Sequence, residues 1–89
     1  MEVLFLKSFL HDLKKNKDQR LKAAVKSLIT DLKDANALSS IPGVVKLKGY
    51  TTAYRFRIGD YRIGFFKNPS GEIILARCVK RSDIYKLFP

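Results

Sequence analysis

The residues best suited to chemistry in this sequence are arginines in the segment YRFRIGDYRIGFF, residues 54–66. Arg55 and Arg57 alternate with large apolar residues before a Gly-Asp pair, and Arg62 follows in a second alternating run. Such a pattern predicts a β-hairpin whose glycine occupies the first position of a type II′ turn. Guanidinium groups match phosphate in charge and shape, so these residue types favour an anionic ligand.

The hairpin's pairing follows by counting outward from its two-residue turn. Arg57 should lie opposite Arg62, and Arg55 opposite Gly64, with opposed residues on the same face of the sheet. Like charges placed opposite each other destabilise a sheet, and an anionic ligand would explain why they were kept together. The other face should be apolar and carry Tyr54, Phe56, Ile58, Tyr61, Ile63 and Phe65.

A second turn, Asn-Pro-Ser-Gly at residues 68–71, leads into a third strand. If Lys67 pairs with Glu72 across this turn, Arg77 lies opposite Arg62 and extends the arginine row to three strands. A β-bulge between the strands would shift Arg77 out of that row.

Two further basic residues, Lys80 and Arg81, stand where the third strand should end, and Tyr85 follows Arg81 by one helical turn. Basic groups beside an exposed aromatic ring suit single-stranded RNA, whose phosphates pair with cations and whose unpaired bases stack. Arginine can stabilise a charged phosphorane but is a poor proton acceptor. The pattern therefore predicts phosphate binding more directly than cleavage.

The charge of the whole chain agrees with an anionic partner. The 89 residues carry a net charge of +10, from 18 Lys and Arg against 8 Asp and Glu. Residues 44–89 hold 10 basic and 3 acidic residues, net +7, whereas residues 1–43 hold 8 and 5, net +3. The positive field belongs to the C-terminal half. The alternative is that these lysines and arginines only solvate one face of a sheet.

Other classes of function have little support in the composition. One His and one Cys supply no metal-ligand set, so neither a metal nor another cofactor is predicted, and His11 is interpreted as a surface or packing residue. Cys78 lies in an apolar run and cannot form a disulfide within the chain. No apolar run approaches the roughly 20 residues of a membrane span. We expect a cytoplasmic protein of one domain, residues 1–89.

The elements that must position these residues follow from the periodicity. Residues 1–6 predict a strand covered on both faces. Ser8 should cap a short helix, and Asp18 a longer one that ends near Ala35. Residues 44–47, the hairpin and residues 72–79 predict strands, and Ser82 should cap a final helical turn. The expected fold class is α+β: an N-terminal strand and a helical hairpin packed on a mainly antiparallel four- to five-stranded sheet, with a short C-terminal helix.

Three segments together resemble the RelE/ParE superfamily of type II toxins, in particular its RelE branch. They are VVKLKG at residues 44–49, YRFRIGDYRI at 54–63 and KRSDIY at 80–85, and the opening FLKSFLHDLKK also fits. The resemblance covers nearly the whole chain. It implies a RelE-like fold and a toxin held in check by a cognate acidic antitoxin. It also implies an endoribonuclease that enters the ribosome and cleaves messenger RNA by 2′-hydroxyl attack, inhibiting translation without a metal.

The resemblance also assigns roles to residues. It implies catalytic roles for Arg57, Arg62, Arg81 and Tyr85: Arg62 stabilises the phosphorane, Arg81 assists the leaving group and Tyr85 stacks on a base. RNA-binding roles are expected for Lys46, Lys48, Arg55, Arg77 and Lys80. Family nucleases often carry lysine where this chain has Arg55 and Arg57, so the general base is not identified, and Arg57 is expected to polarise the 2′-hydroxyl instead.

Two other readings compete with the nuclease. A ParE-like toxin that poisons DNA gyrase would share the fold and need no catalytic residues. A non-catalytic RNA-binding or ribosome-associated module would use the basic face only to hold phosphate.

Overall fold

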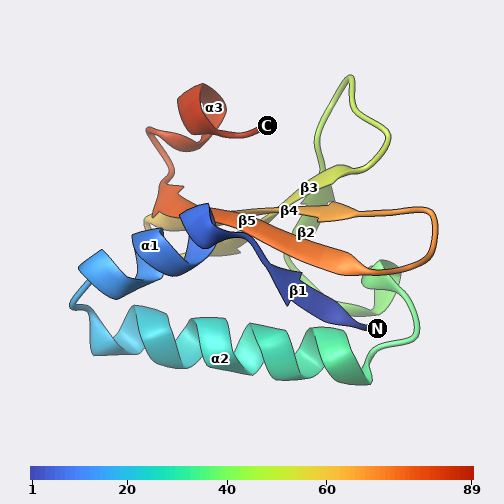
Figure 1. The fold of residues 1–89 in the computed structure, drawn as a ribbon, viewed down its shortest axis with the longest axis horizontal. Helices are drawn as coiled ribbons and strands as arrows, with labels where there is room; N and C mark the ends of the chain where they lie inside the picture. The colour runs from blue at the N-terminus through green and yellow to red at the C-terminus, as the bar shows by residue number, and fades with distance from the viewer.

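The computed structural model describes residues 1–89 (Figure 1). Most of it consists of a five-stranded mixed sheet with two helices packed on one side. The expected α+β class is confirmed. None of the helices is long and apolar enough to cross a membrane. In chain order the elements are β1 (Val3–Phe5), α1 (Lys7–Lys15), α2 (Gln19–Asp34), a 3-10 turn (Leu38–Ser40), β2 (Val44–Lys46), β3 (Ala53–Ile58), β4 (Tyr61–Lys67), β5 (Ile73–Lys80) and α3 (Ile84–Leu87).

The strands lie in the order β1-β5-β4-β3-β2. Strands β2 to β5 form an antiparallel meander, and β1 pairs with β5 in parallel at one edge. The predicted hairpin register is confirmed, with Arg57 opposite Arg62 and Arg55 opposite Gly64. Gly59 adopts a φ of +54°, which a glycine accommodates readily at the start of such a turn.

The predicted pairing between β4 and β5 is wrong. The second turn pairs Lys67 with Ile73, because Glu72 is drawn into the turn, where its N–H donates to Asn68 Oδ1 at 2.9 Å. A register shift between Gly64 and Phe65 then adds one more residue to β5. Arg77 consequently lies opposite Gly64.

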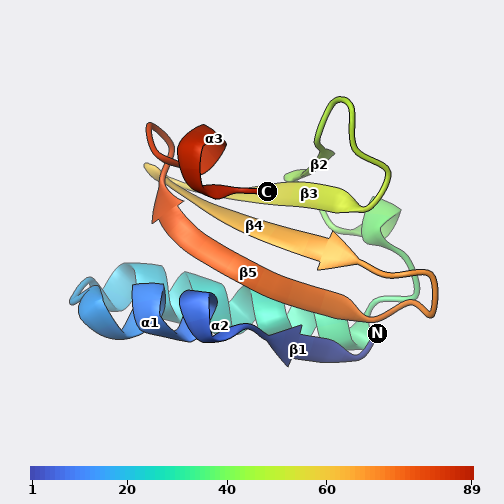
Figure 2. The ribbon, with the colours of Figure 1, turned by 45° about the horizontal axis from the view of Figure 1, so that its top comes forward.

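The helices α1 and α2 cover one face of the sheet, and the main hydrophobic core lies between the two layers (Figure 2). Asp18 caps α2 as predicted, since its side chain accepts from the Arg20 and Leu21 N–H groups at 2.9 and 3.3 Å. The buried members of this core are Val3, Phe9, Leu21, Val25, Leu28, Leu32, Leu38, Ile41, Ile63, Phe65, Ile73, Leu75 and Cys78.

The beginning of the chain differs from expectation at two points. Strand β1 is not covered on both faces: Val3 is buried, but Leu4, Phe5 and Leu6 are exposed at the sheet edge. Ser8 does not cap α1, which already begins at Lys7; its hydroxyl instead donates to the Ala76 carbonyl at 2.6 Å. The helix thereby gains an anchor on β5.

The N-terminal ammonium forms a second long-range anchor. It donates to the carbonyls of Leu32, Lys33 and Ala35 at 3.0, 2.9 and 3.2 Å. These carbonyls lie at the C-terminal end of α2, where a positive charge complements the helix dipole.

The other face of the sheet is covered in part by the C-terminal segment, with Leu47 packed beside it. Helix α3 lies on the side opposite α1 and α2 (Figure 2), and begins without the predicted cap from Ser82. Phe88 is buried against Gly64, and its ring centroid lies 4.9 Å from that of Phe66. A second, smaller core results, consisting of Ala53, Ala76, Val79, Ile84 and Phe88. The rest of this face remains open for the arginines.

Candidate nucleic-acid interface

Four arginines gather on the open face of the sheet, and we call them the arginine cluster: Arg55, Arg57, Arg62 and Arg81. Arg57 and Arg62 are direct cross-strand neighbours. Arg81 joins them because its N–H donates to the Asp60 carbonyl in the hairpin turn at 2.8 Å. The sequence predicted the first three from hairpin counting, and the Asp60 contact explains how a residue beyond β5 reaches them.

The Arg62 side chain is held within this cluster. Its Nη1 donates to the carbonyls of Gly59 and Tyr61, each at 2.9 Å. Partial burial lowers the pKa of Arg62 below that of an ordinary guanidinium. The same pKa is lowered further by the positive charges of Arg57, Arg55 and Arg81. Binding an anion would relieve this repulsion.

Acidic groups do little to neutralise the cluster. Asp60 is the carboxylate that opposes the fall in the pKa of Arg62, and no arginine of the cluster forms a salt bridge. Four guanidinium groups without a salt bridge are suited to bind the oxygens of a phosphate.

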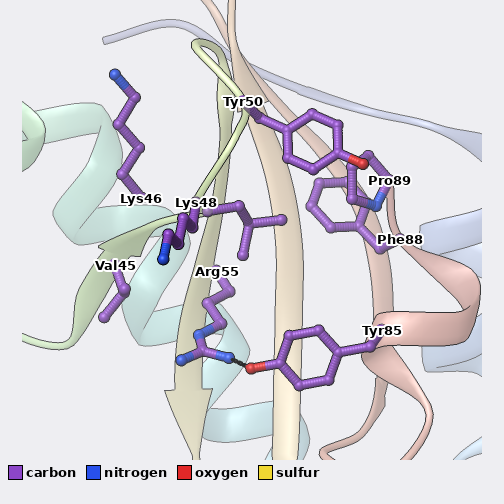
Figure 3. Close-up of a pocket in the computed structure, with 9 residues that line it drawn as sticks. Val45, Lys46, Lys48, Tyr50, Arg55, Tyr85, Phe88 and Pro89 are labelled. Atoms are coloured by element: carbon purple, nitrogen blue, oxygen red, sulfur yellow. Dashed lines mark hydrogen bonds between the residues drawn. The ribbon is translucent and has the colours of Figure 1, made fainter.

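Tyr85 lies beside the cluster, through contact with Arg55. The Arg55 guanidinium donates to the Tyr85 hydroxyl, and Arg55 Cζ lies 5.4 Å from the centroid of the Tyr85 ring (Figure 3). The tyrosine is nevertheless 71% exposed. Its ring is thus held by a cation while remaining available for stacking on a base.

A groove of about 370 Å³ adjoins Arg55 and Tyr85 (Figure 3), and we call it the tyrosine groove. Its lining residues are Val45, Lys46, Leu47, Lys48, Tyr50, Arg55, Tyr85, Phe88 and Pro89. The predicted RNA-binding residues Lys48 and Arg55 are therefore brought together here. Tyr50 was missed by sequence reasoning, because nothing in the local pattern links the loop before β3 to the C-terminal segment.

Lys46 lines this groove only at its margin. Lys46 pairs with Tyr54, which packs against the main core. The Lys46 side chain therefore lies on the face of the sheet that α1 and α2 cover. In Figure 3 its ammonium points away from Arg55 and Tyr85.

The structure separates Arg77 from the arginine row in which it was predicted. Its guanidinium binds Asp12 of α1, with Nε–Oδ2 and Nη2–Oδ1 distances of 2.7 and 3.0 Å. The Cys78 N–H donates to the same carboxylate at 3.0 Å. Burial alone would raise the pKa of Asp12, but these hydrogen bonds outweigh it and lower the pKa. Arg77 therefore ties α1 to β5.

Lys80 is also separated from the arginine cluster. It lies opposite Tyr61, which packs against the main core, so the two share the face of the sheet that carries the helices. Lys80 lines a second hollow together with Asp12 and Arg77.

No group of three or more His, Cys, Asp or Glu side chains lies close enough together to hold a metal ion. His11 is exposed on α1, away from the cluster. Cys78 is buried, and burial raises the pKa of its thiol to about 11, which leaves it an unreactive core residue.

Comparison with known proteins agrees with this architecture. Residues 3–85 match the family described as the ParE toxin of the type II toxin-antitoxin system parDE. The chain is 38% identical over 90 residues to Toxin RelE3 of Methanocaldococcus jannaschii, covering 100% of both chains.

Solved structures extend the likeness to three dimensions. A chain of the RelB-RelE antitoxin-toxin complex from Methanococcus jannaschii has a TM-score of 0.81 and 36% identity, covering 97% of this chain and 99% of that one. The YoeB dimer from Staphylococcus aureus has a TM-score of 0.72 at 21% identity, covering 91% and 97%, and supports the fold alone.

Proposed function

Because the chain belongs to the RelE/ParE superfamily of type II toxins, we propose that it is a ribosome-dependent endoribonuclease that cleaves messenger RNA and so inhibits translation. The observation that carries the proposal is the arginine cluster: four guanidinium groups on one open face, beside an exposed tyrosine and without a salt bridge. Such a face suits a negatively charged backbone with unpaired bases.

In the proposed reaction, the ribose 2′-oxygen attacks the adjacent phosphate and its proton passes to solvent water. The bond to the 5′-oxygen of the next nucleotide breaks, which leaves a 2′,3′-cyclic phosphate and, after protonation by water, a 5′-hydroxyl. Arg62, which hydrogen bonds hold in place, stabilises the phosphorane. Arg81 stabilises the charge on the leaving oxygen, and Tyr85 orients a base by stacking. The nucleophile comes from the RNA and the positive charge from the protein, so this scheme assigns no step to a metal.

The arginine cluster contains no evident acceptor for the proton of the 2′-hydroxyl. Arginine remains protonated in proteins, so no member of the cluster is suited to act as a general base. We assign Arg57, the exposed cross-strand partner of Arg62, to polarise the 2′-hydroxyl electrostatically. A lysine with a lowered pKa could accept the proton instead. Arg57→Lys should therefore preserve or increase the cleavage rate, and a rate as low as that of Arg57→Ala would contradict this assignment.

We also propose a cognate antitoxin as partner, as in the complexes of related toxins. A chain of charge +10 favours an acidic segment. The exposed apolar side chains Leu4, Phe5, Leu6 and Leu10 could pack against an amphipathic one. Inhibition then requires that the antitoxin covers Arg62 or Arg81, or displaces α3. The ribosome as site of action places the free toxin in the cytoplasm.

The cleavage proposal can be tested with purified protein, translating ribosomes and a defined messenger RNA, with cut sites mapped by primer extension. Arg62→Ala and Arg81→Ala should each reduce the cleavage rate about a hundredfold or more, because each removes a charge that stabilises the transition state. Arg20→Ala is the matched control, since it removes an exposed arginine on α2, outside the cluster. Messenger RNA left intact by the unmodified protein would refute the nuclease.

The match to the ParE family makes gyrase inhibition the second candidate. A gyrase toxin should block DNA supercoiling in vitro and should be largely indifferent to Arg62→Ala. If the protein binds RNA tightly but neither cuts it nor inhibits gyrase, the remaining interpretation is a non-catalytic RNA-binding module.

A further inference from the structure

We propose that the tyrosine groove holds one unpaired nucleotide of the RNA next to the arginine cluster, with Tyr50 and Tyr85 as stacking surfaces for its base. This inference rests on the proposed RNA-directed function and adds a base-stacking residue, Tyr50, to it. Tyr85 already orients a base in the proposed reaction, whereas Tyr50 has no part in that reaction.

The two tyrosines stand at opposite ends of the groove, with Phe88 and Pro89 near Tyr50 and Arg55 beside Tyr85 (Figure 3). Tyr50 comes from the loop before β3 and Tyr85 from α3, so only the folded C-terminal segment brings them to one site. The volume of about 370 Å³ lies within the range typical of small-ligand sites. Most of the lining is apolar or aromatic, as a base requires.

Tyr50 has no evident structural role. It is 51% exposed and belongs to neither hydrophobic core. Its backbone N–H closes a turn by donating to the Leu47 carbonyl at 3.3 Å, and this bond does not depend on the side chain. The Tyr50 ring has an apolar body and a polar tip, and its exposed position at the groove suits contact with a ligand.

The charges around the groove favour nucleic acid over other occupants. Lys48 and Arg55 line it, Lys46 lies at its margin, and no Asp or Glu side chain lines it. Arg55 belongs both to the groove and to the arginine cluster, because its charge acts on Arg62 and its guanidinium contacts Tyr85. A strand that places one phosphate on the cluster can therefore continue past Arg55 and insert its neighbouring base into the groove.

The test measures binding of a short single-stranded RNA with 2′-O-methyl groups, which cannot be cleaved by 2′-hydroxyl attack, by fluorescence anisotropy. Tyr50→Ala should weaken binding about tenfold, the usual effect of removing one base-stacking ring. Tyr50→Trp should restore binding, since a larger ring can also stack. His11→Ala removes an exposed ring from α1, which lies on the opposite face of the sheet, and should have no effect.

An abasic oligonucleotide of the same length separates stacking from other roles. Tyr50→Ala and the unmodified protein should bind it equally, whereas Arg62→Ala should weaken binding to both probes. If Tyr50→Ala binds the base-containing RNA normally while Arg62→Ala does not, the groove proposal is overturned and RNA recognition stands. Equal weakening of both probes by Tyr50→Ala would also overturn it. If the unmodified protein binds neither probe, the groove proposal is overturned, while the cleavage assay with translating ribosomes decides the proposed function separately.

Discussion

Gly64 offers a sharp test of how the C-terminal segment is held on the sheet. A Cβ atom at this position would lie 2.5 Å from Cγ and Cδ2 of the Phe88 ring and 2.9 Å from its Cδ1. These separations are well inside van der Waals contact, so Gly64→Ala cannot coexist with the observed ring position. Gly64 lacks a positive φ, so the substitution itself adds no backbone strain.

The expected cost follows from the two ways in which the chain can respond. If Phe88 stays and its surroundings shift, overpacking of this kind costs about 1–3 kcal/mol. If the ring leaves the sheet, the protein loses the burial of one phenylalanine, about 1.5–3 kcal/mol. Either response predicts a loss of about 2 kcal/mol in the free energy of unfolding, which for a domain of this size lowers Tm by roughly 10 °C.

The assay is urea unfolding of a double-mutant cycle. In the Phe88→Ala background the obstructing ring is absent, so Gly64→Ala should cost almost nothing. Gly64→Ala should also weaken single-stranded RNA binding, because displacing Phe88 moves α3 and withdraws Tyr85 from Arg55. An equal cost of Gly64→Ala in both backgrounds would show that Phe88 does not cause the destabilisation and would refute the reasoning.

Three further predictions concern stability. Asp12→Ala should cost about 3 kcal/mol in urea unfolding, because it leaves the partly buried Arg77 and the Cys78 N–H without their partner; a loss below about 1 kcal/mol would contradict this role. The pKa of Asp12 is lowered from 3.8 in the folded state, so its contribution should be complete above about pH 4 and disappear as pH falls through the lowered pKa, a dependence that Asp12→Asn should lack. Asp18→Ala should cost about 1 kcal/mol by removing the N-cap of α2, while RNA affinity measured by anisotropy stays unchanged.

The sequence was most informative where structure depends on local rules. The two-residue turn determines the β3–β4 register, so Arg57 and Arg62 could be paired by counting. The N-cap Asp18 and the apolar periodicity also predicted α2 correctly, and the helix ends at Asp34, close to the expected position. Alternation within the hairpin also predicted which face is apolar.

Errors arose where distant segments determine the outcome. Arg77 does not lie opposite Arg62, because Glu72 is part of the turn and the β4–β5 register shifts at Gly64. Its guanidinium instead forms a salt bridge with Asp12 of α1. Residues 1–6 were expected to be buried on both faces of the sheet, because a short edge strand and a buried strand can have the same apolar pattern. Tyr50 could not be assigned because its partners in the groove come from the far end of the chain.

The parallel pairing of β1 with β5 has a consequence for the order of synthesis. Translation produces β1 first, yet its partner in the sheet is complete only at Lys80. Until residues 73–75 have been made, β1 has no strand with which to pair, and the inner faces of α1 and α2 are covered by only part of the sheet. Arg81 and Tyr85 emerge later still. A ribosome making this protein therefore completes β5 before either the full sheet or the full anion-binding face can exist.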